Sequence, residues 1–120
     1  MVVAYEGTCN LKAPLNPVPE KLLESGDYIS YAPIARCFEH RFTDEACAYN
    51  KYYNRHLRGW TDVAGGLPIG FNEYYNVSKF EDLPFLFTET IFDDIRYYHS
   101  VGIKCMTYMH LPMILWGVKI

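Results

Sequence analysis

The ten residues LPIGFNEYYN, at positions 67–76, are the most informative stretch of this chain. Residues 67–71 are largely apolar and predict a buried strand, and polar side chains follow where that strand runs out. In a β-α-β protein, ligands and catalytic groups collect at the carboxyl ends of the strands. We therefore expect Glu73 to lie at such an end, beside the phenol of Tyr74.

Three further apolar runs predict strands at residues 2–5, 28–34 and 103–108. Two stretches between them have the apolar periodicity of helices. The first starts at Thr43-Asp44-Glu45, a capping hydroxyl followed by two acids, and leaves Asn50 largely outside its apolar stripe. Its stripe is Ala46, Tyr49, Tyr53, Leu57 and Trp60. The second helix has the stripe Leu83, Phe87, Ile91, Ile95 and Tyr98.

The second helix is expected to become regular near Thr90 and to stop at Gly102, in the left-handed conformation that ends many helices. Asp93 and Asp94 then fall near its start, where the helix dipole accounts for two acids without any functional role.

The strand centres lie near positions 3, 29, 69 and 105. A (β/α)8 barrel uses about 31 residues per unit, so this spacing fits part of such a barrel, and it also fits a small open parallel sheet. We predict an α/β fold, a partial TIM-barrel-like domain over residues 1–120 with about four parallel strands and two main helices. No glycine-rich phosphate loop follows any strand, so we expect no nucleotide fold and no cofactor.

Composition excludes several classes of function. The net charge is −3 with both signs interspersed, which disfavours nucleic-acid binding. No apolar run approaches the roughly 20 residues of a membrane span. The amino terminus lacks the basic start of a signal peptide, so we expect a cytoplasmic protein, unless a preceding segment is missing. Tyrosine supplies 11 residues, which suits carbohydrate surfaces as well as ordinary packing.

The four cysteines, Cys9, Cys37, Cys47 and Cys105, form no Cys-x-x-Cys pair. This favours reduced structural thiols over a disulfide framework or a zinc site. Cys37 and His40 have Cys-x-x-His spacing, but no second pair lies nearby in sequence, so we expect no metal site.

Several short motifs carry a resemblance to a known family. They are YAPI at 31–34, Arg36-Cys37, His40, EYY at 73–75, DIRYY at 94–98 and Gly102. Together they resemble a large bacterial family of unknown function that is related to glycoside hydrolases, in particular to α-glucuronidase-like proteins. The similarity spans most of residues 1–112. It implies a central (β/α)8 barrel of which this chain matches the later part, so a fragment of a longer protein is expected.

Glycoside hydrolysis needs two carboxylates on either side of one bond. Glu73 and Glu6 both follow predicted strands and are the catalytic candidates, and burial among aromatic rings would suit Glu73 as the acid. The alternative is that each glutamate caps a loop or pairs with Arg36.

The candidate substrate-binding residues are Arg36, His40, Tyr74, Tyr108 and His110. Arg36 could grip the carboxylate of a uronic acid with two hydrogen bonds, or equally pair with Glu6 or Glu73 inside the protein. His40 could bind or transfer protons at the rim, although a lone histidine is more often structural. Tyr108 and His110 flank the end of the fourth strand.

The resemblance thus implies a glycoside-hydrolase-like protein whose parent family hydrolyses carbohydrate, with a uronic-acid-containing glycan as one candidate substrate. Two alternatives stay open. One is an inactive half-barrel that pairs through its exposed sheet edges into a homodimer. The other is a carbohydrate-binding module that uses its tyrosines.

Overall fold

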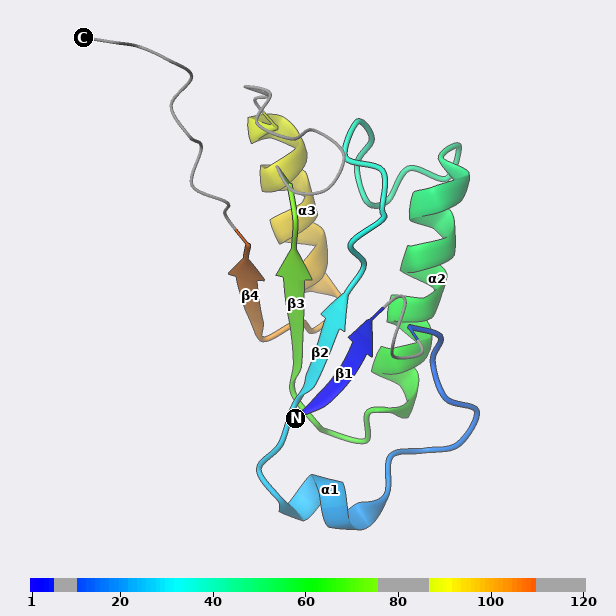
Figure 1. The fold of residues 1–120 in the computed structure, drawn as a ribbon, viewed down its shortest axis with the longest axis vertical. Coiled ribbons are helices and arrows are strands. Elements are labelled where there is room, and N and C mark those ends of the chain that lie inside the picture. Colours follow the sequence, from blue (N-terminus) through cyan, green and yellow to red (C-terminus); the bar gives the residue numbers. More distant parts are fainter. Residues whose placement is uncertain (6–10, 76–86, 110–120) are drawn as a thin grey trace, which may run out of the picture.

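A computed structural model of the chain describes residues 1–5, 11–75 and 87–109. These residues form an α/β fold with a four-stranded, all-parallel sheet and three helices (Figure 1). The elements are β1 (Val2–Tyr5), α1 (Glu20–Glu24), β2 (Ile29–Ala32), α2 (Ala48–Val63), β3 (Ile69–Glu73), α3 (Thr88–Ser100) and β4 (Cys105–Tyr108). The predicted fold class is therefore confirmed, with the single turn of α1 added to the two longer helices.

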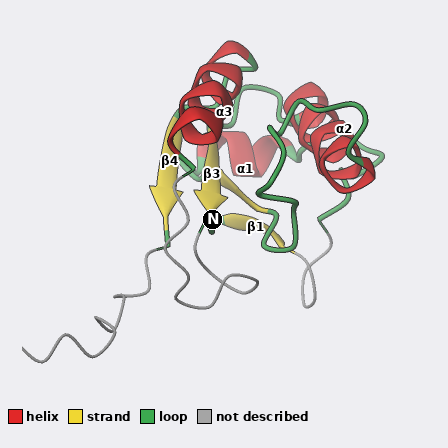
Figure 2. Cartoon of the chain, turned by 90° about the horizontal axis from the view of Figure 1, so that it is seen from above, coloured by secondary structure: helices red, strands yellow, loops and turns green. Residues whose placement is uncertain are grey.

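The strands lie in the order β1-β2-β3-β4, which is their order along the chain, and every neighbouring pair is parallel. The three helices lie on one side of the sheet (Figure 2). Doubly wound folds reverse their strand order and carry helices on both faces, whereas a (β/α)8 barrel keeps one order and one helical face. The arrangement is consistent with an arc of such a barrel.

One face of the sheet packs against the helices. Side chains alternate between the two faces of a strand, so Ile29 and Tyr31 of β2 share a face with Ile69 and Phe71 of β3. Together these residues form the main apolar core with buried residues of the two long helices, namely Tyr53, Leu57 and Trp60 of α2 and Tyr98 of α3.

On β2, β3 and β4 the opposite face carries small and polar side chains. Asn72 of β3 donates a hydrogen bond to the hydroxyl of Ser30 on β2 (2.9 Å) and accepts one from the hydroxyl of Thr107 on β4. Gly70 lies on this face too, where an added Cβ would sit 2.8 Å from Sγ of Cys105. In a closed barrel this face would line the interior.

The first long helix begins later than the sequence predicts. Its N-cap is Cys47, and the expected cap region around Thr43 forms turns instead. Asp44 accepts a hydrogen bond from the Ala46 backbone N–H through its side chain (2.9 Å) and one from the Cys47 N–H through its carbonyl (3.1 Å). These bonds stabilise a turn, which competes with helix formation at the same acids.

The buried faces of both helices differ from the predicted stripes. Asn50 and Asp94 are buried, although the sequence pattern places Asn50 outside the apolar stripe and attributes Asp94 to the helix dipole. Tyr49 and Ile95 belong to the predicted stripes, yet they are 61% and 41% exposed. α3 begins at Thr88, so Asp94 lies in mid-helix and the dipole interpretation is wrong for it. The expected stop at Gly102 is confirmed by its positive φ of 91°.

Among the described strands, β1 and β4 lie at the sheet edges, and all four residues of β4 are exposed. In the described part of the chain, no helix has the length and apolar character needed to cross a membrane.

Candidate functional site

A buried cluster of charges lies where β2 and β3 end. Its members are Arg36 from the loop after β2, Glu73 at the last position of β3 and Asp94 from the middle of α3. All three side chains are almost completely inaccessible to solvent. Charged side chains are rarely buried unless they are paired, so the contacts within this cluster determine whether it is tolerated.

Arg36 grips Glu73 with two prongs. Its Nε donates to Oε2 of Glu73 at 3.2 Å, and its Nη2 lies 3.0 Å from Oε1. This is the planar fork geometry that suits a guanidinium and a carboxylate. The remaining edge of the guanidinium is also used, because Nη1 donates to the Cys37 carbonyl oxygen at 3.2 Å.

Asp94 is the second anion against the same guanidinium. Its Oδ2 accepts from Nη2 of Arg36 at 2.5 Å and from the phenol of Tyr75 at 3.1 Å. Its other oxygen accepts from the backbone N–H of Phe42 at 2.8 Å. Asp94 therefore fastens α3 to the loop between β2 and α2 at two positions.

Aromatic rings close the cluster off from water. The Arg36 guanidinium carbon lies 4.6 Å from the ring centre of Phe38, 5.1 Å from Tyr75 and 5.4 Å from Phe42. The phenol of Tyr98 donates to Oε1 of Glu73 at 2.5 Å. Cation–π contacts strengthen when the cation is desolvated, so the rings favour the buried guanidinium while excluding solvent.

Burial and charge shift the pKa values of this cluster in opposing ways. Burial raises the pKa of Glu73 and of Asp94 above their ordinary values, and the charge of Arg36 only partly offsets that effect. For Arg36, burial disfavours the charged form, but the nearby carboxylates, Glu73 above all, outweigh it and its pKa rises. One cation thus faces two carboxyl groups, so one negative charge is left without a matching positive charge. This favours binding of a proton to one of the two carboxyl groups.

The sequence left two roles open for Arg36, and the structure contains the internal pair with Glu73. The two-pronged grip predicted for a sugar carboxylate is occupied by the protein's own glutamate. Asp94 was missed as a member. Its position four residues before the buried Tyr98 places both side chains on one face of α3, and that spacing was the available signal.

The other predicted residues are distributed along the same edge of the sheet. Tyr74 is buried, Tyr108 is 43% exposed at the end of β4, and His40 is exposed with its Nδ1 3.2 Å from Sγ of Cys37. Glu6 and His110 lie outside the described residues, so the predicted carboxylate pair of Glu6 and Glu73 has no described geometry.

An open recess of about 210 Å³ lies at the carboxyl ends of β3 and β4. It is lined by Asn72, Tyr74, Thr107, Tyr108 and Met109, which offer an amide, a hydroxyl, two phenols and an apolar thioether. A larger hollow of about 830 Å³ runs along α2 among charged side chains. It lies on the outer helical surface, whereas the smaller recess lies where parallel sheets hold their ligands.

The chain was compared with protein-family models, curated proteins and solved structures. None of them matches.

Replacing Arg36 with Met should destabilise the fold by about 3–5 kcal/mol at neutral pH, because it leaves two buried carboxyl groups without their cation. Loss of Arg36 should raise the folded-state pKa of both carboxyls further. A carboxyl group whose pKa is raised in the folded state destabilises the fold as pH rises from its unfolded-state pKa towards its folded-state pKa. The loss of unfolding free energy in Arg36→Met should therefore be smaller at about pH 5 than at neutral pH. Chemical denaturation at the two pH values measures both effects.

Arg41→Met is the matched control, since Arg41 pairs with Asp93 at 2.7 Å in an exposed position. That variant should lose about 1 kcal/mol or less. Equal losses in the two variants, or an Arg36→Met deficit that grows in acid, would contradict the described role of the cluster.

Proposed function

We propose that this chain is a carbohydrate-directed, glycoside-hydrolase-like segment of a (β/α) barrel, and that the recess at the carboxyl ends of β3 and β4 binds sugar. The observation that carries the proposal is the set of groups lining that recess. Asn72 and Thr107 bond each other, but the second N–H of the amide and the lone pairs of the hydroxyl can still bond the hydroxyls of a sugar ring. Tyr108 offers an aromatic surface for the ring's apolar face.

The geometry favours binding over hydrolysis in this chain. A catalytic acid must come within hydrogen-bond reach of the glycosidic oxygen. Glu73 is fully buried, and both of its carboxyl oxygens are engaged by Arg36, with Tyr98 on one of them. Glu73 is therefore better suited to holding the end of β3, and with it Asn72 and Tyr74, in position beside the recess.

Isothermal titration calorimetry with neutral and uronic-acid-containing oligosaccharides tests the proposal. We expect binding heat with the native chain, and Tyr108→Ala should weaken affinity by about tenfold, which corresponds to about 1.4 kcal/mol. With aryl glycosides and glucuronides, we expect no turnover above that of a Glu73→Gln variant.

Tyr28→Ala is a closely matched control. Tyr28 is 42% exposed, against 43% for Tyr108. It directly precedes β2, so it lies at the amino ends of the strands, away from the recess. It should bind sugar as the native chain does. The proposal fails if no oligosaccharide gives heat, or if Tyr28→Ala weakens binding as much as Tyr108→Ala.

A second candidate function is self-association through a sheet edge. β4 lies at an edge of the described sheet, and its side chains are exposed, including the apolar Met106. Exposed strand edges offer unpaired backbone groups to another chain. We propose that two copies pair through this edge and extend the barrel-like arc.

Light scattering across a range of protein concentrations measures the mass in solution. The native chain should approach twice its monomer mass, and Met106→Lys should shift it to the monomer because lysine blocks edge pairing. Phe92→Lys, which places the same charge on the exposed face of α3, should leave the dimer intact. A native chain that stays monomeric at every concentration would refute the pairing.

A further inference from the structure

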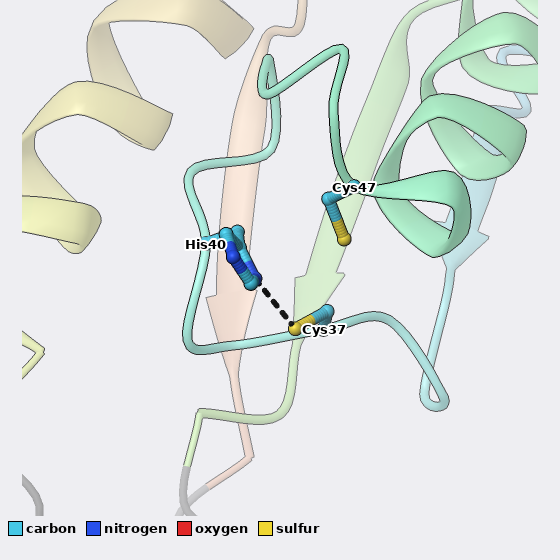
Figure 3. A group of neighbouring side chains, drawn as sticks. All are labelled: Cys37, His40 and Cys47. Atoms are coloured by element: carbon cyan, nitrogen blue, oxygen red, sulfur yellow. Dashed lines mark hydrogen bonds between the residues drawn. The ribbon is translucent and has the colours of Figure 1, made fainter.

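Three side chains outside the charge cluster converge beside the start of α2. Cys37 and His40 come from the loop after β2, and Cys47 is the N-cap of α2 (Figure 3). Their ligand atoms, two sulfurs and one imidazole nitrogen, all lie within 4.8 Å of one another. The sequence disfavours a metal site because it holds no Cys-x-x-Cys pair and no second pair close to Cys37 and His40. Cys47 is seven residues beyond His40, which is not a recognised ligand spacing.

These distances suit a tetrahedral zinc ion. Zinc binds cysteine sulfur at about 2.3 Å and histidine nitrogen at about 2.0–2.1 Å, so ligand atoms in a tetrahedral site lie roughly 3.5–3.8 Å apart. The Cys37 sulfur and His40 Nδ1 are 3.2 Å apart, and the third ligand atom is within 4.8 Å of both. Displacements of the ligand atoms by up to about 1 Å would bring the set to the required geometry.

Asn50 holds the backbone that carries two of these ligands. Its Oδ1 accepts from the Cys37 N–H at 2.9 Å, and its Nδ2 contacts the carbonyl oxygens of Cys37 at 2.9 Å, His40 at 3.1 Å and Arg41 at 3.0 Å. Asn50 is fully buried on α2, three residues after Cys47. One helix therefore supplies the third ligand and also fixes the loop that supplies the other two, so the site is preorganised.

We propose that Cys37, His40 and Cys47 form a zinc site, with the fourth position open to solvent and filled by water. Binding replaces the thiol protons of Cys37 and Cys47 by bonds to the metal, so two protons pass to the solvent and no electron is transferred. Because Arg36 donates to the Cys37 carbonyl oxygen, the metal would fasten the loop that delivers Arg36 to the buried charge cluster. These three residues do not line the recess at β3 and β4, so zinc binding does not depend on whether that recess binds sugar.

The test uses the full chain, stripped of metal with a chelator and kept reduced. Zinc chloride is titrated calorimetrically, and cobalt chloride gives an optical spectrum. We expect one metal per chain, thiolate-to-cobalt charge-transfer absorption in the near ultraviolet, and a higher unfolding temperature with zinc. Cys37→Ser, Cys47→Ser and His40→Gln should each weaken zinc binding by more than about 100-fold, since losing only an outer hydrogen-bond partner costs about 10–100-fold.

Cys105→Ser is the matched control, because Cys105 is an exposed cysteine on β4 outside the group. It should bind zinc and cobalt as the native chain does. Circular dichroism checks folding, and serine is itself a favoured N-cap at position 47, so that variant should retain α2. The proposal is overturned if cobalt gives no thiolate absorption, or if Cys37→Ser and Cys47→Ser bind zinc as tightly as Cys105→Ser.

Discussion

The buried guanidinium of Arg36 is the interaction on which the rest of this structure depends. It pairs with Glu73 at the end of β3 and with Asp94 in the middle of α3, and it also bonds the loop after β2. Three segments that are far apart in sequence thus meet at one cation. A buried charge left without partners is strongly unfavourable, so the three segments are held in a single mutual arrangement.

This constraint accounts for the character of the carboxyl edge of the sheet. Glu73 is drawn inward to Arg36, which leaves Asn72, Tyr74 and Tyr108 to form the accessible recess beside it. The same loop that carries Arg36 continues into Cys37, which lies next to His40 and Cys47. The recess and the Cys37-His40-Cys47 group are therefore both connected to the charge cluster, the first through β3 and the second through the loop after β2.

The general fold was predictable because four apolar runs separated by helical periods leave few arrangements for a small α/β chain. The functional geometry was less accessible. Asn50 and Asp94 are polar residues on buried helical faces. A buried face predicted from apolar residues alone leaves such positions out, so the predicted face is displaced around the helix. The pairing of Arg36 was open between two roles, because only the packed structure shows that three aromatic rings exclude water from it.

Carbon-13 NMR of the side-chain carboxyl groups, assigned through bonds and followed across a pH titration, measures directly how burial and the charge of Arg36 act on Glu73 and Asp94. Glu73 and Asp94 should titrate above the ordinary pKa values of glutamate and aspartate, because burial outweighs the charge of Arg36. The exposed acids provide the internal reference. If both carboxyl groups titrate at their ordinary values, the cluster is solvated; if both titrate below them, the charge of Arg36 outweighs burial. Either result contradicts the predicted direction.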